Sequence, residues 1–158
     1  MEKLDRNNFV LYGVHFQLVC EIKPACDSTG QILTDLPQAR YSKASASRLH
    51  RYGSGEFCRF RIPAGWNIPG VYAILVDSHL KYIGECRDLT FRFNAGYGQI
   101  SPKNCYVGGR QTNCRINTLI LEATQAGSTI NLYLHPASDH RELESQILNR
   151  CDRPPWNR

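Results

Sequence analysis

A dense stretch of apolar and β-branched residues lies in the middle of the chain, where two short runs follow each other closely. The first run is Gly70–Val76 and the second is Lys81–Gly84. Both runs suit a buried pleated surface, and the Asp-Ser pair between them suits a turn. The pattern therefore predicts a β-hairpin, around which the rest of the chain is organised.

Each strand of this hairpin contains one tyrosine, Tyr72 in the first and Tyr82 in the second. Side chains alternate between the two faces of a strand, so the loop length decides whether the two rings share a face. A loop of three residues places them on one face and a loop of two separates them; we expect the three-residue loop. On the hairpin alone, two core tyrosines whose hydroxyl groups reach the surface are the simpler interpretation.

Other elements follow from apolar spacing. Alternation predicts strands at residues 16–22, 57–62 and 130–134, and helical spacing predicts helices at residues 45–52, 86–94, 112–127 and from 139 onward. Glycines and prolines make residues 95–111 a long loop. In the last helix, Asp139 and Glu142 resemble a capping box, which leaves Glu144 at the margin of the buried stripe.

Length and composition limit the class of protein. A chain of 158 residues, with 42% hydrophobic and 21% charged residues, is typical of one soluble globular domain. We expect residues 1–65 to form an extension that packs on a core made by residues 66–158, since no Gly-, Ser- and Pro-rich linker separates them. No apolar run approaches membrane-spanning length, and the N-terminus lacks the apolar segment of a secretory signal, so we expect a cytoplasmic protein without membrane contacts.

The cysteines do not suggest a metal or disulfide framework. There are seven of them, an odd number, and none forms a C-x-x-C pair. Structural zinc sites and disulfide scaffolds usually show paired spacings. We therefore expect no zinc and, by default, buried reduced thiols.

Basic residues exceed acidic ones by nineteen to fourteen, which gives a formal charge of +5. This surplus suits a polyanionic partner, although it is common in proteins that never bind nucleic acid. The residues that we expect to contact DNA are Arg48, Arg51, Arg59, Arg61, Lys103, Arg110 and Arg115. Arg59 and Arg61 project together from one face of a predicted strand, which suits either a phosphate-binding surface or an ordinary solvated face.

Gly70-Val71-Tyr72 followed by Tyr82-Ile83-Gly84 resembles the paired signature of the GIY-YIG nuclease superfamily. Three later residues agree with this resemblance in order and approximate spacing. They are Arg92 in the helix after the hairpin, Glu144 in the last helix and Asn157 near the end of the chain. The resemblance covers residues 69–158. The two tripeptides alone are a weak signal, but the combination of five parts is specific.

The resemblance implies a site for phosphodiester hydrolysis. By analogy, Glu144 anchors one Mg²⁺ or Mn²⁺ ion, for which one carboxylate suffices because hydrated Mg²⁺ keeps several waters. Arg92 contacts the scissile phosphate, and Tyr72 orients or deprotonates the attacking water beside Tyr82. Lys81 is a further candidate, since some restriction enzymes of the family use a lysine just before the second tyrosine. Asn157 supports the site from a Pro-containing tail.

One position departs from the family pattern. Family members usually place a His or Tyr one helical turn after the arginine, where this chain has Gly96. Tyr97 follows directly. We expect Tyr97 to take this role if the helix ends early.

The implied fold is α+β: a small three-stranded antiparallel sheet flanked by helices, with an N-terminal basic extension that adds strands. The implied function is a metal-dependent DNA endonuclease, most similar to small stand-alone restriction enzymes, because the chain has no room for a separate DNA-binding domain. Cutting both strands with one site per chain favours a homodimer on DNA. The alternatives are a nickase, a structure-specific or single-strand nuclease in repair or phage defence, and a non-catalytic DNA-binding module. The intact Tyr72, Tyr82, Arg92 and Glu144 argue against the last of these.

Overall fold

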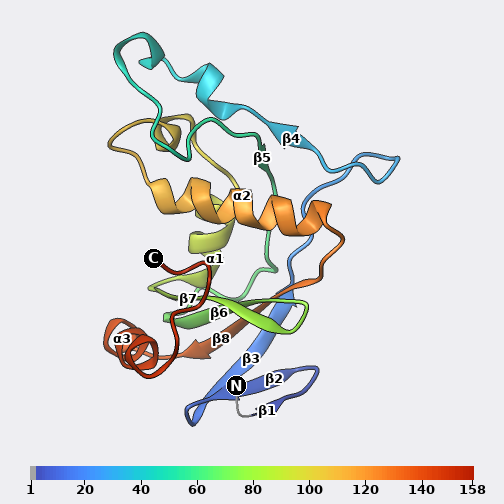
Figure 1. Ribbon diagram of the computed structural model, residues 1–158, viewed down its shortest axis with the longest axis vertical. Helices are drawn as coiled ribbons and strands as arrows, with labels where there is room; N and C mark the ends of the chain where they lie inside the picture. Colours follow the sequence, from blue (N-terminus) through green and yellow to red (C-terminus); the bar gives the residue numbers. More distant parts are fainter. Residues whose placement is uncertain (1–2) are drawn as a thin grey trace. The chain divides into compact units, whose positions relative to one another are not determined.

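The computed structural model describes residues 3–158 and divides into two compact units (Figure 1). Unit 1 contains the described part of Met1–Ile22 together with Ile62–Arg92 and Ser128–Arg158, and unit 2 contains Lys23–Arg61 and Phe93–Gly127. This division differs from the one predicted at residue 65. Each unit combines segments that are far apart in the chain, and local sequence patterns do not reveal such partnerships.

Unit 1 is built on one six-stranded sheet with the order β1-β2-β3-β8-β6-β7. The strands are β1 (Lys3–Leu4), β2 (Asn8–Leu11), β3 (Val14–Glu21), β6 (Gly70–Val76), β7 (His79–Cys86) and β8 (Ile130–Pro136). Every neighbouring pair is antiparallel. The mixed α+β class is therefore confirmed. β7, β6 and β8 are neighbours in this sheet, and the N-terminal strands lie beyond β8, so the sheet has six strands where the prediction gave its core three. β7 is left as an edge strand.

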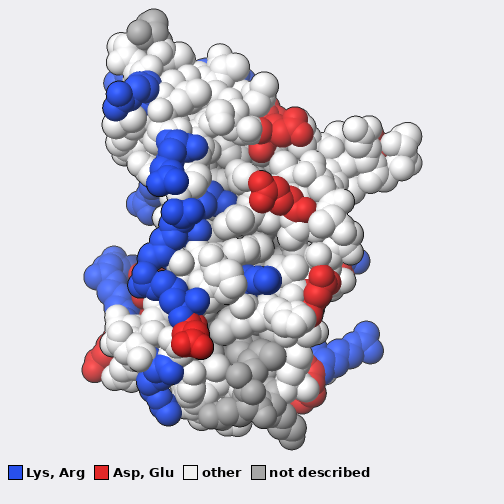
Figure 2. Space-filling view, in the orientation of Figure 1, with Lys and Arg blue, Asp and Glu red and all other residues white. Residues whose placement is uncertain are grey.

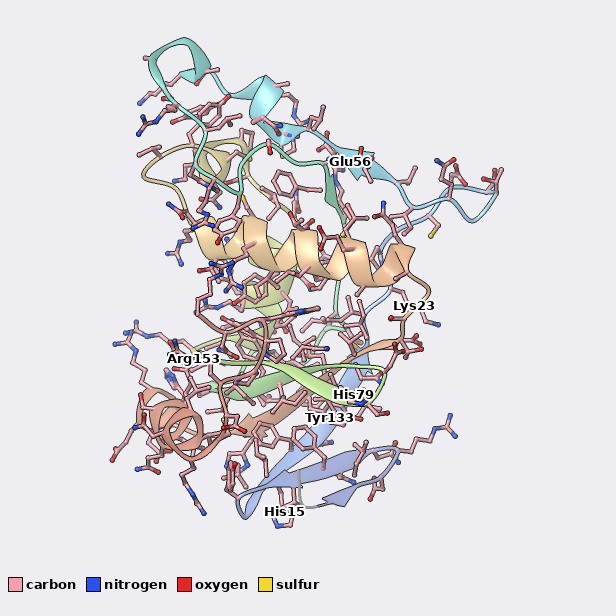
Figure 3. All side chains as sticks on the ribbon, viewed as in Figure 1. His15, Lys23, Glu56, His79, Tyr133 and Arg153 are labelled. Atoms are coloured by element: carbon pink, nitrogen blue, oxygen red, sulfur yellow. The ribbon has the colours of Figure 1, made fainter. Side chains whose placement is uncertain are left out.

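One face of this sheet packs against α3 (His140–Arg150). Val71, Ala73 and Ile83 point to this face and form a cluster with Ile147 of α3, all of them at most 2% exposed. Tyr133 of β8 belongs to the same cluster (Figure 3). Successive strand residues face opposite sides, so Tyr72 and Tyr82 emerge from the face that α3 does not cover.

The hairpin turn has two residues, not the three that we expected. β6 ends at Val76 and β7 begins at His79, which Figure 3 labels. Asp77 and Ser78 form the loop with φ angles of 48° and 65°. Positive φ at both central residues is typical of a type I′ turn, whose twist matches the twist of the two strands.

A β-bulge compensates for the shorter turn. Ile74 pairs with Tyr82, but the next residue, Leu75, pairs with Leu80, so Lys81 is the extra residue on β7. A two-residue turn alone separates the two tyrosines. The extra residue changes the parity once more, and Tyr72 and Tyr82 return to the same face.

Unit 2 has little regular structure apart from α2 (Gln111–Gln125). Its strands are the short pair β4 (Thr34–Asp35) and β5 (Phe57–Cys58), and its 3₁₀ segments are η1 (Pro37–Arg40), η2 (Ala44–Ala46) and η4 (Pro102–Cys105). The helix predicted at residues 45–52 is absent, and only η2 overlaps it. The strand predicted at residues 57–62 is cut to its first two residues, although the alternation of buried and exposed side chains continues.

Buried polar side chains hold these irregular segments. Asn117 of α2 is fully buried; its Oδ1 accepts a hydrogen bond from the Cys58 backbone N–H at 3.0 Å. Its Nδ2 donates to the carbonyls of Cys58 and Tyr97, both at 2.8 Å. The Asn117 side-chain amide thus makes the two hydrogen bonds to the Cys58 backbone that a neighbouring strand would make in a sheet. In the described residues no helix has the length and apolar character needed to cross a bilayer.

Candidate active site

The structure places the two signature tyrosines side by side on the hairpin. The ring centroids of Tyr72 and Tyr82 lie 6.1 Å apart with an angle of 38° between the ring planes. Tyr72 pairs across the strands with Gly84, and Tyr82 pairs with Ile74. The rings are therefore diagonal neighbours on one face of the β6–β7 hairpin.

Gly84 allows this arrangement. A Cβ atom at position 84 would lie 2.5 Å from both Cζ and the hydroxyl oxygen of Tyr72, and 2.8 Å from Cε1 of Tyr82. The Tyr72 ring thus lies across the bare backbone of Gly84. The last glycine of the signature has a steric role, because any side chain there displaces both phenol rings.

Glu144 and Arg92 approach each other from different helices of unit 1. α1 (Leu89–Arg92) follows β7 directly, and Glu144 lies in the middle of α3. Burial raises the pKa of the half-buried Glu144 carboxyl, and the nearby Glu85 carboxylate raises it further. The Arg92 guanidinium and His140 act in the opposite direction. These opposing effects show that Glu144 shares its surroundings with one acidic and two basic groups.

Arg92 also acts on the tyrosine face of the hairpin. Cys86 pairs with Gly70, so it lies on the same face as Gly84 and both tyrosines. Burial raises the pKa of the Cys86 thiol to about 11, and the Arg92 guanidinium opposes this rise. The Arg92 charge therefore acts on Cys86, which lies on the tyrosine face, and on Glu144, whose helix α3 covers the opposite face of the sheet. β7 carries Tyr82 and Cys86 on the tyrosine face and Glu85 on the opposite face.

Sequence reasoning missed two residues at this site, Glu85 and His140. His140 Nδ1 lies 2.5 Å from Glu85 Oε2, and the His140 side chain is 11% exposed. Glu85 directly follows the second signature tripeptide, and His140 lies four residues before Glu144, which is one helical turn. This spacing was the available signal, but 55 positions separate His140 from Glu85.

Asn157 binds the free edge of β7. Its Oδ1 accepts a hydrogen bond from the Ile83 N–H at 2.9 Å, and its Nδ2 donates to the Ile83 carbonyl at 2.7 Å. Beside it, the Trp156 N–H donates to the Lys81 carbonyl at 2.8 Å. The Asn157 side chain and the Trp156 backbone N–H therefore bond part of the free edge of β7, and they hold the strand at Ile83, between Tyr82 and Gly84.

The structure places the remaining two candidates differently. Lys81 is the bulge residue. The pKa of Asp77 in the turn is lowered mainly by the hydrogen bond from the Thr129 N–H, and the Lys81 charge adds to this effect. Tyr97 belongs to unit 2, at the end of η3 (Phe93–Tyr97), which is a π-helical segment. The Gly98 N–H donates to the Phe93 carbonyl at 2.7 Å, and the rings of Phe93 and Tyr97 meet edge-on at 5.1 Å. The helix does not end before Tyr97 as expected; it widens by one residue per turn.

All seven residues predicted to contact DNA lie in unit 2. Six of them, Arg48, Arg51, Arg59, Arg61, Lys103 and Arg110, are exposed. Figure 2 shows basic side chains gathered on the side of unit 2 where the loop before α2 lies. Arg115 corrects the expectation, because it is only 9% exposed. Asn117, which was expected on the same polar side of α2, is buried as well, so this side of the helix is not solvated at these two positions.

Arg59 and Arg61 both line a cavity of about 260 Å³ in unit 2. Lys23, which Figure 3 labels, lines it as well. Arg59 and Arg61 are not equivalent. Arg59 forms an ion pair of 3.0 Å with Asp35, which also binds Arg40 at 2.9 Å. These two arginines lower the pKa of the Asp35 carboxyl to about 2.

The residues around Glu144 suit a hydrated Mg²⁺ ion. No group of three His, Cys, Asp or Glu side chains in residues 3–158 forms a ready-made metal site. Mg²⁺ does not need one, since it binds through one or two carboxylates and keeps its waters. Glu144 and Glu85 repel each other electrostatically, and a divalent cation beside Glu144 would relieve that repulsion.

No protein-family model, curated protein or solved structure matches the chain. The resemblance to the GIY-YIG superfamily therefore rests on the motif residues of the sequence alone.

Proposed function

We propose that this protein is a metal-dependent DNA endonuclease of the GIY-YIG type. One observation supports this most strongly: Tyr72 and Tyr82 lie side by side on one face of the hairpin, with 6.1 Å between the ring centroids, and strand β7 leads almost directly into the helix that carries Arg92. Together with Glu144, these side chains come from β6, β7, α1 and α3. The half-buried carboxyl of Glu144 and the guanidinium of Arg92 come from two different helices of the same unit.

The roles follow from the charges. Arg92 contacts the scissile phosphate and offsets charge that develops on its oxygens. Tyr72 and Tyr82 orient the attacking water, while Gly84 and Asn157 position the strand that bears Tyr82. Glu144 holds Mg²⁺, with Glu85 beside it. When bound, this ion supplies Lewis-acid stabilisation of the phosphoryl and leaving oxygens.

His140 and Glu85 are positioning residues in this proposal. Their contact links the end of β7 to the first turn of α3, one turn before Glu144. The pair therefore fixes the distance between the hairpin and the Glu144 carboxylate. The basic residues of unit 2 bind the DNA backbone and contribute affinity, which falls as salt rises.

Supercoiled plasmid tests the proposal directly. With Mg²⁺ we expect cleavage, and with EDTA none. Glu144→Gln should reduce the rate by at least about 100-fold while a gel shift with DNA remains, because a catalytic metal ion supplies several kcal/mol. The matched control is Glu142→Gln, which removes a carboxylate from an exposed position on the same helix and should leave cleavage unchanged.

The products distinguish the finer alternatives. Discrete linear fragments favour restriction-type cleavage, for which two chains on a two-fold site are expected. Open circles favour a nickase. Intact supercoils with a gel shift would contradict the nuclease and favour a DNA-binding module, and equal cleavage by Glu144→Gln would contradict the site.

A further inference from the structure

A second cavity of unit 2 is unrelated to the predicted catalytic residues. It has a volume of about 330 Å³ and is formed largely by the loop between η4 and α2. This volume lies at the lower end of the range for small-ligand pockets. The cavity therefore suits a ligand about as large as one nucleotide.

The wall of this cavity contains two aromatic rings that lie against each other. The centroids of Tyr41 and Tyr106 are 4.8 Å apart, with 32° between the ring planes. The Tyr106 hydroxyl donates a hydrogen bond of 2.8 Å to the Gln38 carbonyl, and Tyr106 is part of the unit 2 core. Tyr106 is thus held by its hydrogen bond and its core contacts, and Tyr41 packs against it. Fixed aromatic surfaces favour stacking of a flat heterocycle, because little side-chain entropy is lost on binding.

The charged residues that line the cavity are both basic. Lys103 and Arg110 are exposed, and no acidic residue lines the cavity with them. Asn104 lies between them in the chain and stabilises the loop, since its Oδ1 accepts a hydrogen bond from the Arg110 N–H at 3.2 Å. Two cations beside an aromatic surface match a ligand that has both an anionic group and a ring.

We propose that this cavity binds one unpaired nucleotide, with its base on Tyr41, which the buried Tyr106 ring supports, and its phosphate between Lys103 and Arg110. A simple anion would use the cations alone, and an apolar ligand would use the rings alone. Val107 also lines the cavity and is 57% exposed, so it offers the base an apolar contact beside Tyr41. In this form the inference rests on the proposed function, since the nucleotide belongs to the DNA substrate.

Binding of small probes tests the cavity without any cleavage. We would titrate Glu144→Gln protein in EDTA with dTMP, thymidine and inorganic phosphate, and follow the Tyr41 and Lys103 signals by NMR. We expect saturable 1:1 binding of dTMP, at least about tenfold tighter than either thymidine or phosphate, because only dTMP uses both parts of the site. Absence of saturable dTMP binding, or dTMP binding no tighter than phosphate, would overturn the proposal.

Variants assign the two halves of the site. Tyr41→Leu keeps an apolar contact with Tyr106 and should weaken dTMP binding while phosphate binding is unchanged. Arg110→Gln, at an exposed position that folding does not require, should weaken binding of both. Arg141→Gln on α3 removes one exposed positive charge from unit 1 and is the matched control; dTMP binding that falls equally in Arg141→Gln and Arg110→Gln would mean a general charge effect and would contradict the site.

DNA that contains 2-aminopurine extends the test to a polymer substrate. The probe base is placed in a single strand, or opposite an abasic position in a duplex, and its fluorescence is compared with wild-type and Tyr41→Leu protein. A fluorescence change that depends on Tyr41 supports capture of a base from DNA, and an unchanged signal contradicts it. If plasmid cleavage fails but dTMP binds, the nuclease proposal is wrong and the nucleotide site stands; the reverse result removes only the site.

Discussion

Unit 1 and unit 2 become ordered in different ways. In unit 1 the ladders of β8-β6-β7 and the apolar cluster beneath α3 determine the positions of side chains. In unit 2 the secondary-structure pieces are short, and buried polar groups such as Asn117 and Asn104 hold the loops. The predicted catalytic residues, Tyr97 apart, lie in unit 1, and the predicted DNA contacts all lie in unit 2. Chemistry needs fixed geometry, whereas contact with a phosphate backbone tolerates side chains on loops.

The largest effect in unit 1 is expected from Gly84→Ala. The added methyl group would overlap the Tyr72 ring at 2.5 Å, so one or both phenols must move. We expect a loss of roughly 1–3 kcal/mol in the free energy of unfolding, together with loss of cleavage. Urea unfolding and plasmid cleavage measure the two effects. Gly96→Ala is the control, since its nearest atom would be 3.7 Å away; a Gly84→Ala protein as stable and active as wild type would show that the rings do not need this arrangement.

A smaller effect is expected from Asn157→Ala, which removes two hydrogen bonds from the edge of β7. We expect a loss of about 1–2 kcal/mol in stability, because each bond contributes about 0.5–1.5 kcal/mol and water can replace part of it. Cleavage should fall more than binding of DNA. Asn149→Ala, at an exposed position on α3, is the matched control. Equal effects of the two variants would argue against a specific role for the tail.

In unit 2 we expect Arg61→Ala to weaken DNA binding more than Arg59→Ala. Both arginines line one cavity, but Asp35 already neutralises part of the Arg59 charge. Loss of one phosphate contact should reduce the slope of log K against log salt by about 0.9. Filter binding at several salt concentrations measures this slope. Arg115→Ala should instead lower stability, since Arg115 is buried; a larger slope change for Arg115 than for Arg61 would reverse our assignment.

The smallest effect is expected from the ion pairs of Asp35. Its folded-state pKa of about 2 lies below the ordinary value of 3.8, so the ionised carboxylate stabilises the folded state above about pH 4. This stabilisation is lost as the pH falls from about 4 through 2. Asp35→Asn should therefore be less stable than wild type at pH 6 by about 1 kcal/mol or less, because the arginine partners are largely exposed. The urea midpoints of the two proteins should converge near pH 2; a constant difference would contradict the assignment.

Local patterns predicted the parts of the fold that depend on near neighbours. The hairpin runs, the third strand β8 and the helices α2 and α3 lie close to the predicted residues. The predictions were wrong where no tertiary contact supported a locally predicted element, or where other contacts replaced the predicted one. Residues 45–52 have helical spacing but form only η2, and the predicted capping box of α3 makes no side-chain cap hydrogen bond.

The sequence by itself determined the hairpin, the positions of its two tyrosines along the strands and the residue types of the candidate site, because strand and helix periodicities depend on residues a few positions apart. Only the tertiary structure decided that the bulge at Lys81 returns both rings to one face, that Asn157 pairs with Ile83 and that His140 meets Glu85. Those contacts join residues up to 74 positions apart. The Asn157 and His140 contacts form only when distant segments meet, and no short window of sequence contains both partners. The bulge lies within the hairpin, but its position depends on the pairing register of the two strands.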